Sequence, residues 1–186
     1  MKILAIADRP PKEKIQTILD THHIDIVCVL GDLEQLSLFE LGGVQDIPKI
    51  GVYGNHCSGA YFEPLGITNV HLKTFDFGGV TFGGFEGCVR YKDDPSATMY
   101  TQEEATEMLK DFPYVDVMLT HAPPYGINDE SDSLSHQGYK ALREYLERKK
   151  PKYLLHGHTY PTSEQVVTKF VDTTIFYVYE DKIVEV

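Results

Sequence analysis

The chain has 186 residues, of which 42% are hydrophobic and 24% charged, and its formal net charge is −11. This composition is typical of a soluble globular protein, and the length suits one domain with a substantial core. No apolar run approaches the roughly 20 residues that a membrane span requires. The few basic residues are scattered, so the charge balance argues against extended nucleic-acid binding.

The first residues of the chain and its cysteines indicate the cellular compartment and limit the type of fold. Residues 1–7 lead directly into Asp8 and are too short for a signal peptide, so we expect a cytoplasmic protein. The cysteines are odd in number and far apart, which excludes a disulfide framework and a Cys-rich zinc site. With no repeat, low-complexity tract or linker, residues 1–186 are predicted to form a single domain.

The first half of the chain alternates short apolar strands with helical segments. The expected order is strand 2–7, helix 11–22, strand 24–30, helix 34–41 and strand 49–53. Strands that are apolar throughout, joined by short connections, are typical of a parallel sheet covered on both faces. Ligands of such sheets bind beyond the carboxyl ends of the strands.

Polar residues follow each of these three strands at that end. Asp8 comes directly after the first strand, Gly31-Asp32 follows the second, and Gly54-Asn55-His56 follows the third. Taken alone, the third stretch is also the pattern of a simple turn, since Gly-Asn favours positive φ. An Asn carbonyl oxygen can also bind a divalent cation without adding charge, and a neighbouring His can protonate what the cation holds.

The middle of the chain has a stronger β pattern. Residues 69–77 and 79–85 alternate around Gly78-Gly79 and predict a hairpin. Residues 86–100 are expected to form a polar loop. Residues 101–111 open with a helix N-cap pattern and an acidic first turn, which predicts a helix.

The second half repeats the arrangement of strand followed by polar residue. Strand 114–120 ends at His121, a helix is predicted over 136–149, and strand 152–155 leads into His156-Gly157-His158. Alternating runs are expected to complete a second, more antiparallel sheet, at 164–171, 174–179 and 182–186.

Five successive strand ends therefore carry Asp, Asp, Asn-His, His and His-x-His. Carboxylate, amide oxygen and imidazole suit divalent ions such as Mn²⁺, Fe²⁺ or Zn²⁺. One carboxylate can bridge two such ions at roughly 3.5–4 Å, an arrangement used in phosphoryl transfer. One shared site explains five such strand ends better than five unrelated turns do.

In this combination and order, the sequence resembles the calcineurin-like metallophosphoesterases, in particular a branch of small single-domain phosphoesterases. The family motifs run Asp-x-His, Gly-Asp, Gly-Asn-His-Asp/Glu, His and Gly-His-x-His. Here they read Asp8-Arg9-Pro10, Gly31-Asp32, Gly54-Asn55-His56-Cys57, Thr120-His121-Ala122-Pro123-Pro124 and Gly157-His158-Thr159-Tyr160. The resemblance implies an α/β fold: a four-layer αββα sandwich of two mixed β-sheets flanked by helices, with metals at the strand ends.

The resemblance also implies which residues hold metal. One site is intact, with ligands Asp32, Asn55, His121 and His158. The other site would use Asp8 and the bridging Asp32, but the two histidines that the family has there are Pro10 and Tyr160 in this chain. We therefore expect the second site to be weak or empty, unless an oxygen-preferring ion such as Mg²⁺ or Mn²⁺ binds it with waters.

His56 matches the family's general acid or phosphate-orienting residue. The acidic residue that usually follows it is Cys57 in this chain, which leaves the orientation of His56 less well determined.

Three further residues are candidates for a substituted ligand or a group behind the ligands. His156 lies two residues before His158 and faces the same way on an extended strand. One alternative is a register in which it replaces a ligand, but the Gly157-His158 pattern favours a place behind the ligands or in the core. His136 can reach the site from its loop, and Tyr160 offers a hydroxyl oxygen.

Two interpretations of function follow. The first is a metal-dependent phosphoesterase in which a metal-activated water attacks a phosphodiester or phosphomonoester, with His56 assisting. It implies a small phosphorylated substrate and one or two divalent ions per chain, Mn²⁺ foremost and Fe²⁺, Zn²⁺ or Mg²⁺ as alternatives. The second is a catalytically degenerate scaffold or nucleotide-binding regulator on the same fold, suggested by Pro10, Cys57 and Tyr160.

Overall fold

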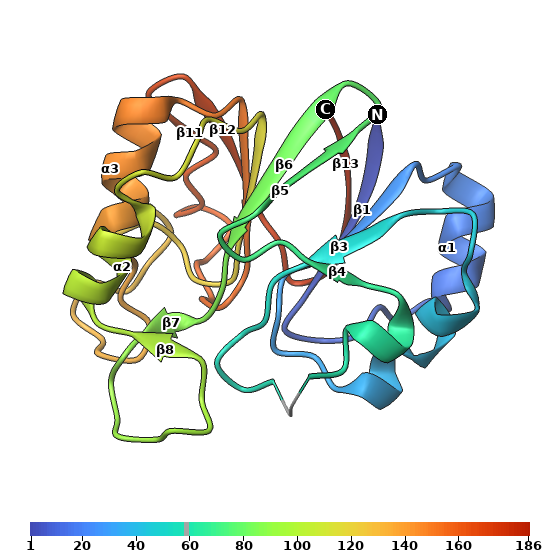
Figure 1. The fold of residues 1–186 in the computed structure, drawn as a ribbon, viewed down its shortest axis with the longest axis horizontal. Helices are drawn as coiled ribbons and strands as arrows, with labels where there is room; N and C mark the ends of the chain where they lie inside the picture. The colour runs from blue at the N-terminus through green and yellow to red at the C-terminus, as the bar shows by residue number, and fades with distance from the viewer. Residues whose placement is uncertain (58–59) are drawn as a thin grey trace.

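Two large mixed β-sheets lie face to face, with helices on their outer sides (Figure 1). The structure is a computed structural model that describes residues 1–57 and 60–186. None of the helices in these ranges combines the length and the apolar character that crossing a membrane would require.

The first sheet has five strands in the order β13-β1-β2-β3-β4. They span β13 (Glu180–Glu185), β1 (Lys2–Ala7), β2 (Ile26–Val29), β3 (Lys49–Gly51) and β4 (Thr68–Asn69). The four strands β1 to β4 are parallel, and β13 is antiparallel to β1. The outer face of the first sheet is covered by α1 (Ile15–His22) and by two 3₁₀ segments, η1 (Gln35–Gly43) and η2 (Glu63–Leu65).

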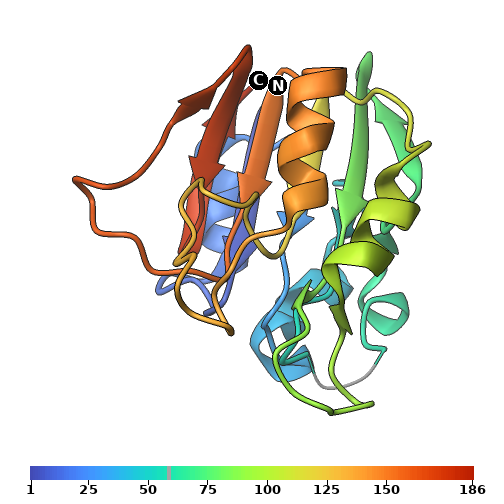
Figure 2. The ribbon, with the colours of Figure 1, turned by 90° about the vertical axis from the view of Figure 1, so that its left-hand side faces the viewer.

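The second sheet has six strands in the order β11-β12-β10-β9-β6-β5. They span β11 (Lys169–Phe170), β12 (Thr173–Tyr177), β10 (Tyr153–His156), β9 (Val117–Thr120), β6 (Val80–Phe85) and β5 (Thr74–Phe77). The inner four strands are parallel and each edge strand is antiparallel to its neighbour. Helices α2 (Gln102–Leu109) and α3 (Lys140–Lys149) lie in front of this sheet in Figure 2. A short parallel pair, β7 (Cys88–Val89) and β8 (Met99–Tyr100), lies beside them.

The side-chain alternation of the strands explains the four layers. On β1, Ile3, Ala5 and Ala7 are buried between the two sheets, whereas Leu4 and Ile6 pack with the residues of α1. The strands of the second sheet follow the same rule, and their outer side chains pack against α2 and α3. Because both faces of each sheet are covered, the inner strands are mostly apolar. The predicted αββα sandwich of two mixed sheets is confirmed.

Several local predictions are also confirmed. Strands β5 and β6 form the hairpin expected around Gly78-Gly79, with Phe77 paired to Val80. Helix α2 begins with a complete capping box, in which the Thr101 side chain and the Glu104 side chain each bind the other's backbone N–H.

Four sequence-based predictions need correction. The run 182–186 does not join the second sheet: it belongs to β13, which pairs with β1 in the first. The second sheet is also mostly parallel, since strand alternation determines which face is buried but not which strand is the neighbour. The segment expected as a helix at 34–41 is the 3₁₀ segment η1, and the helix predicted over 136–149 begins only at Lys140.

Truncating a side chain between the two sheets should destabilise the whole fold. Leu155 is fully buried there, so Leu155→Ala should lower the free energy of unfolding by roughly 2–5 kcal/mol, through lost burial and the cavity left behind. Leu36 is 82% exposed on η1, and Leu36→Ala should change it by less than about 0.5 kcal/mol. Urea unfolding of both variants tests this, and similar losses in the two would contradict the assigned core.

Candidate metal centre

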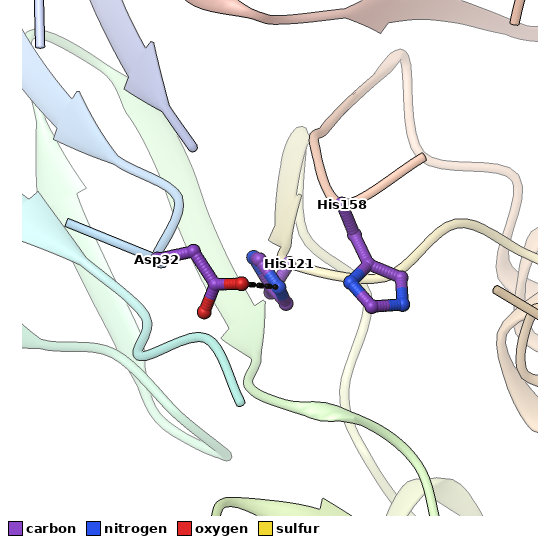
Figure 3. Close-up of side chains that lie close together, drawn as sticks. All are labelled: Asp32, His121 and His158. Atoms are coloured by element: carbon purple, nitrogen blue, oxygen red, sulfur yellow. Dashed lines mark ion pairs between the residues drawn. The ribbon is translucent and has the colours of Figure 1, made fainter. Parts of the chain in front are cut away.

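The carboxyl ends of parallel strands from both sheets meet at one edge of the sandwich. Asp32 follows β2, His121 follows β9 directly, and His158 follows β10. One potential ligand atom from each of these three residues lies within 4.8 Å of the other two. Figure 3 shows His121 between Asp32 and His158. The structure therefore brings Asp32 close to His158, although the two residues are 126 positions apart along the chain (158 − 32).

The backbone at this edge is strained. Asp8, Asp32 and His158 all adopt the left-handed conformation, with φ of 63°, 54° and 71°. Such conformations cost non-glycine residues on the order of 1–3 kcal/mol and concentrate at functional sites. The strain falls on three residues that the sequence predicts as metal ligands.

Two glycines, Gly31 and Gly54, allow the loop after β2 and the loop after β3 to touch. A Cβ on Gly31, whose φ is +95°, would collide with the backbone of Gly54. A Cβ on Gly54 would in turn collide with the Asp32 carboxylate. A third glycine, Gly157, lies so close to Asp8 that a Cβ there would be 2.6 Å from its Oδ2. Glycine is therefore required at these positions of the motifs, because the backbone passes too close to its neighbours, including the carboxylates of Asp8 and Asp32, to leave room for a Cβ.

Backbone carbonyls orient the two imidazoles. The Nδ1 of His121 lies 2.8 Å from the carbonyl oxygen of Leu30, and the Nε2 of His158 lies 2.9 Å from that of Ser135. A neutral imidazole that donates through one nitrogen keeps the lone pair of the other. Each ring can therefore offer one nitrogen to a cation, Nε2 in His121 and Nδ1 in His158.

The free nitrogen of His121 faces two oxygen atoms. Its Nε2 lies 3.1 Å from Asn55 Oδ1 and 3.3 Å from Asp32 Oδ2. Three lone pairs that converge in this way repel one another unless a proton or a cation lies among them. Asn55 is buried, and its Nδ2 finds no hydrogen-bond acceptor among the described residues. The donor set of one carboxylate, one amide oxygen and two imidazoles fits a divalent ion such as Mn²⁺, Fe²⁺ or Zn²⁺.

Burial and charge act against each other in this group. Burial is the largest single influence on Asp32 and His121 and works against their charged forms. The surrounding charges and hydrogen bonds, above all those between the two residues, together outweigh it, so the pKa of Asp32 is lowered and that of His121 is raised. Burial lowers the pKa of His158, which stays neutral and available as a ligand. Burial raises the pKa of Asp8 to about 6, opposed by His121 and by the backbone N–H of His158.

Asp8 and His56 lie next to this group. The carboxylate of Asp8 accepts the backbone N–H of His158, with nitrogen–oxygen distances of 3.1 and 3.0 Å. Asp8 is not among the three residues whose ligand atoms lie within 4.8 Å of one another. The backbone N–H of His56 donates to Asp32 Oδ1 at 2.7 Å, while its imidazole is exposed. Metal binding by Asp8 and catalysis by His56 stay predictions.

The three further candidate residues, His156, His136 and Tyr160, differ in how deeply they are buried. His156 is fully buried, and its Nε2 accepts from Asn128 Nδ2 at 2.9 Å while its Nδ1 lies 3.1 Å from the carbonyl oxygen of Gly157. Both nitrogens are thus used away from the group, and burial lowers its pKa to about 4. His136 packs edge-on against His158, with ring centroids 5.6 Å apart. Tyr160, which is 57% exposed, packs edge-on against His136.

Several contacts at this site were not predicted from the sequence. The sulfur of Cys57 accepts the backbone N–H groups of Asp32 at 3.2 Å and of Gly54 at 3.1 Å, and so links the two ligand loops. Its position in the third motif marked Cys57 as unusual, but not as a hydrogen-bond acceptor. The carbonyls of Leu30 and Ser135 carry no sequence signal, because every residue has a carbonyl.

A sequence model described as calcineurin-like phosphoesterase matches residues 1–161. The chain belongs to this family. Its members are phosphoesterases that use divalent metals, which agrees with the donor set found at the strand ends. Among curated proteins, none matches the chain by sequence.

Solved structures show the same fold at low sequence identity. One matches with a TM-score of 0.65 and 15% identity, covering 94% of this chain and 88% of its own. The protein TT1561 of Thermus thermophilus matches with a TM-score of 0.58 and 19% identity, covering 84% and 80%. A hypothetical protein from the same organism gives 0.53 and 18%, covering 97% and 75%. At these identities the likeness shows the fold alone.

The contact between Gly54 and Asp32 predicts an effect on metal binding. At 100 times its dissociation constant, Mn²⁺ should stabilise the metal-stripped protein by about 2.7 kcal/mol and raise its Tm by roughly 5–10 °C. Gly54→Ala should abolish this increase, because the added methyl group displaces the Asp32 carboxylate. Gly43→Ala adds a methyl group with no neighbour within 4 Å and should keep it. Differential scanning fluorimetry with and without Mn²⁺ tests this, and an undiminished shift in Gly54→Ala would contradict the assignment.

Proposed function

We propose that this protein is a metal-dependent phosphoesterase that hydrolyses a phosphodiester or a phosphomonoester at a single well-formed metal site. The ligands of that site are Asp32, Asn55, His121 and His158. Mn²⁺ is the proposed ion, with Fe²⁺, Zn²⁺ or Mg²⁺ as alternatives, because the donors mix oxygen and imidazole nitrogen. The proposal goes beyond the family in naming the ligands and in assigning one intact site.

The observation that carries the proposal is the convergence of lone pairs at His121. Nε2 of His121 faces Asn55 Oδ1 and Asp32 Oδ2, while the opposite nitrogen is bound by the Leu30 carbonyl. Without a metal ion, only a proton on His121 offsets the repulsion among these buried acceptors, whereas a divalent ion can be bound by all of them at once. The support is strengthened by Ser135, whose carbonyl holds His158 in the complementary orientation.

The residues of the chain divide the work in the proposed reaction. When bound, the ion would supply Lewis-acid activation of water and would neutralise charge on the phosphate oxygens. Asp32, whose pKa is lowered, stays anionic at neutral pH and can orient a water. His56, whose backbone N–H binds Asp32, is exposed, and its imidazole can donate a proton to the leaving oxygen or bind the phosphate.

The substrate is proposed to be a small phosphorylated molecule. A chain with a net charge of −11 has little capacity to neutralise a long phosphate backbone. A cytoplasmic location fits this proposal and the three free cysteines, Cys28, Cys57 and Cys88.

A second candidate function keeps the fold without the chemistry. Pro10 and Tyr160 stand where the family has histidines, so the chain is alternatively a binding scaffold or a nucleotide-binding regulator. The exposed position of Tyr160 favours this candidate, since a phenol at the rim is a poor replacement for an imidazole ligand. Hydrolysis of a phosphoester substrate distinguishes the phosphoesterase from the scaffold or regulator.

The decisive experiment measures hydrolysis of bis-p-nitrophenyl phosphate by metal-stripped protein titrated with Mn²⁺. We expect turnover that depends on Mn²⁺ in the parent protein, and a rate lower by roughly 100-fold or more in His121→Ala, which loses a ligand. His22→Ala removes an exposed imidazole at the end of α1 and should keep the parent rate.

The other outcomes are equally informative. No turnover in any protein, across several metals and with p-nitrophenyl phosphate as a monoester control, would favour the scaffold. Equal rates in the parent and in His121→Ala would show that the metal ligands are assigned wrongly.

A further inference from the structure

Arg9 has a guanidinium group with unused donors. Its Nε donates to the hydroxyl oxygen of Tyr179 at 2.7 Å, while the side chain is exposed. Within the described ranges its two terminal nitrogens make no hydrogen bond and no ion pair. The other arginines, Arg90, Arg143 and Arg148, each donate through a terminal nitrogen to a carboxylate or a carbonyl. Arg9 is therefore oriented by the protein and still free to bind an anion with its planar fork.

The position of Arg9 places this fork beside the metal centre. Arg9 directly follows Asp8 at the carboxyl end of β1, and Asp8 accepts the backbone N–H of His158. Tyr179, which holds Arg9, packs edge-on against Tyr160 with ring centroids 5.7 Å apart. Arg9 thus lies on the side of the centre where Pro10 and Tyr160 replace the two family histidines.

That side of the centre does not fit a second metal ion. Among the described residues it offers the carboxylates of Asp8 and Asp32 and the hydroxyl of Tyr160. The imidazole of His136, which packs on Tyr160, is already bound through Nδ1 to the Glu130 carboxylate at 3.0 Å. Tyr160 is 57% exposed at the rim, and an uncharged phenol oxygen is a weaker ligand than an imidazole nitrogen for ions of this class. Oxygen ligands alone hold Mn²⁺ or Zn²⁺ less tightly than mixed oxygen and nitrogen ligands do.

We propose that the Arg9 guanidinium, oriented by Tyr179, binds the phosphate of the substrate and supplies the positive charge that a second ion would otherwise provide. This inference rests on the proposed function, because it assigns a phosphate to the same centre. Arg9 would act as a phosphate-binding residue, with Tyr179 as its positioning residue.

The charges around the centre support this role. A phosphate that approaches Asp8 and Asp32 meets two carboxylates, and the chain as a whole carries a net charge of −11. Lys12, the next basic residue along the chain, is paired with Glu180 at 3.0 Å. An arginine can also bind two phosphate oxygens at once, which a lysine cannot do with the same geometry.

The test separates phosphate binding from metal binding. Inorganic phosphate is titrated into the Mn²⁺-loaded protein by isothermal calorimetry, for the parent, Arg9→Gln, Arg9→Lys, Tyr179→Phe and Lys12→Gln. Arg9→Gln should weaken phosphate binding by roughly 10- to 100-fold, with an unchanged Kd for Mn²⁺. Arg9→Lys should recover part of this loss, and Tyr179→Phe should give a smaller loss than Arg9→Gln. Lys12→Gln removes a neighbouring but paired charge and should stay within about twofold.

Equilibrium dialysis gives a second readout, with one tightly bound Mn²⁺ expected per chain. The proposal is overturned if Arg9→Gln binds phosphate as the parent does, or if two Mn²⁺ ions bind tightly. In the first case, continued Mn²⁺-dependent hydrolysis would leave the proposed function standing. Conversely, phosphate binding that depends on Arg9 but is accompanied by no hydrolysis would support the binding role of Arg9 and contradict the proposed phosphoesterase activity.

Discussion

The close approach of the Gly31 and Gly54 backbones is the constraint on which the metal centre depends. It brings the loop after β2 against the loop after β3, so that Asp32 and Asn55 reach the same ring of His121. Cys57 reinforces the approach by accepting an N–H from each loop. Since a side chain at either glycine would collide with backbone or carboxylate, the geometry of the centre is determined by the absence of Cβ atoms.

The two sheets contribute different parts of this centre. The first sheet supplies the carboxylates and the amide, and the second sheet supplies the two imidazoles His121 and His158. The apolar layer between the sheets fixes their distance, because its side chains are fully buried and close-packed. The buried and partly repulsive donor group can therefore keep its arrangement, as the stability of the core offsets its cost.

The centre is asymmetric, and the asymmetry has a chemical meaning. On one side, carbonyls of Leu30 and Ser135 orient two imidazoles toward a shared point. On the other side, Asp8 is buried with a raised pKa, Tyr160 lies at the rim, and Arg9 is held by Tyr179. A divalent ion and a guanidinium would then share the task that two ions perform in a two-metal phosphoesterase.

The sequence by itself determined the strand-end residues, because the strand–glycine–polar pattern is a local property, while the αββα fold class followed from the resemblance of its motifs to the calcineurin-like phosphoesterases. It also indicated that one imidazole pair is intact and the other replaced, since Pro10 and Tyr160 are read directly from the motifs. Only the tertiary structure decided that β13 pairs with β1, that His156 turns to Asn128, and that Cys57 joins two loops. These depend on which strand becomes a neighbour and on contacts between residues far apart in the chain, and no local pattern specifies either. The contact of Arg9 with Tyr179 has the same origin, because Tyr179 lies 170 positions away along the chain and reaches Arg9 only when β13 pairs with β1, where Glu180 lies opposite Ala7.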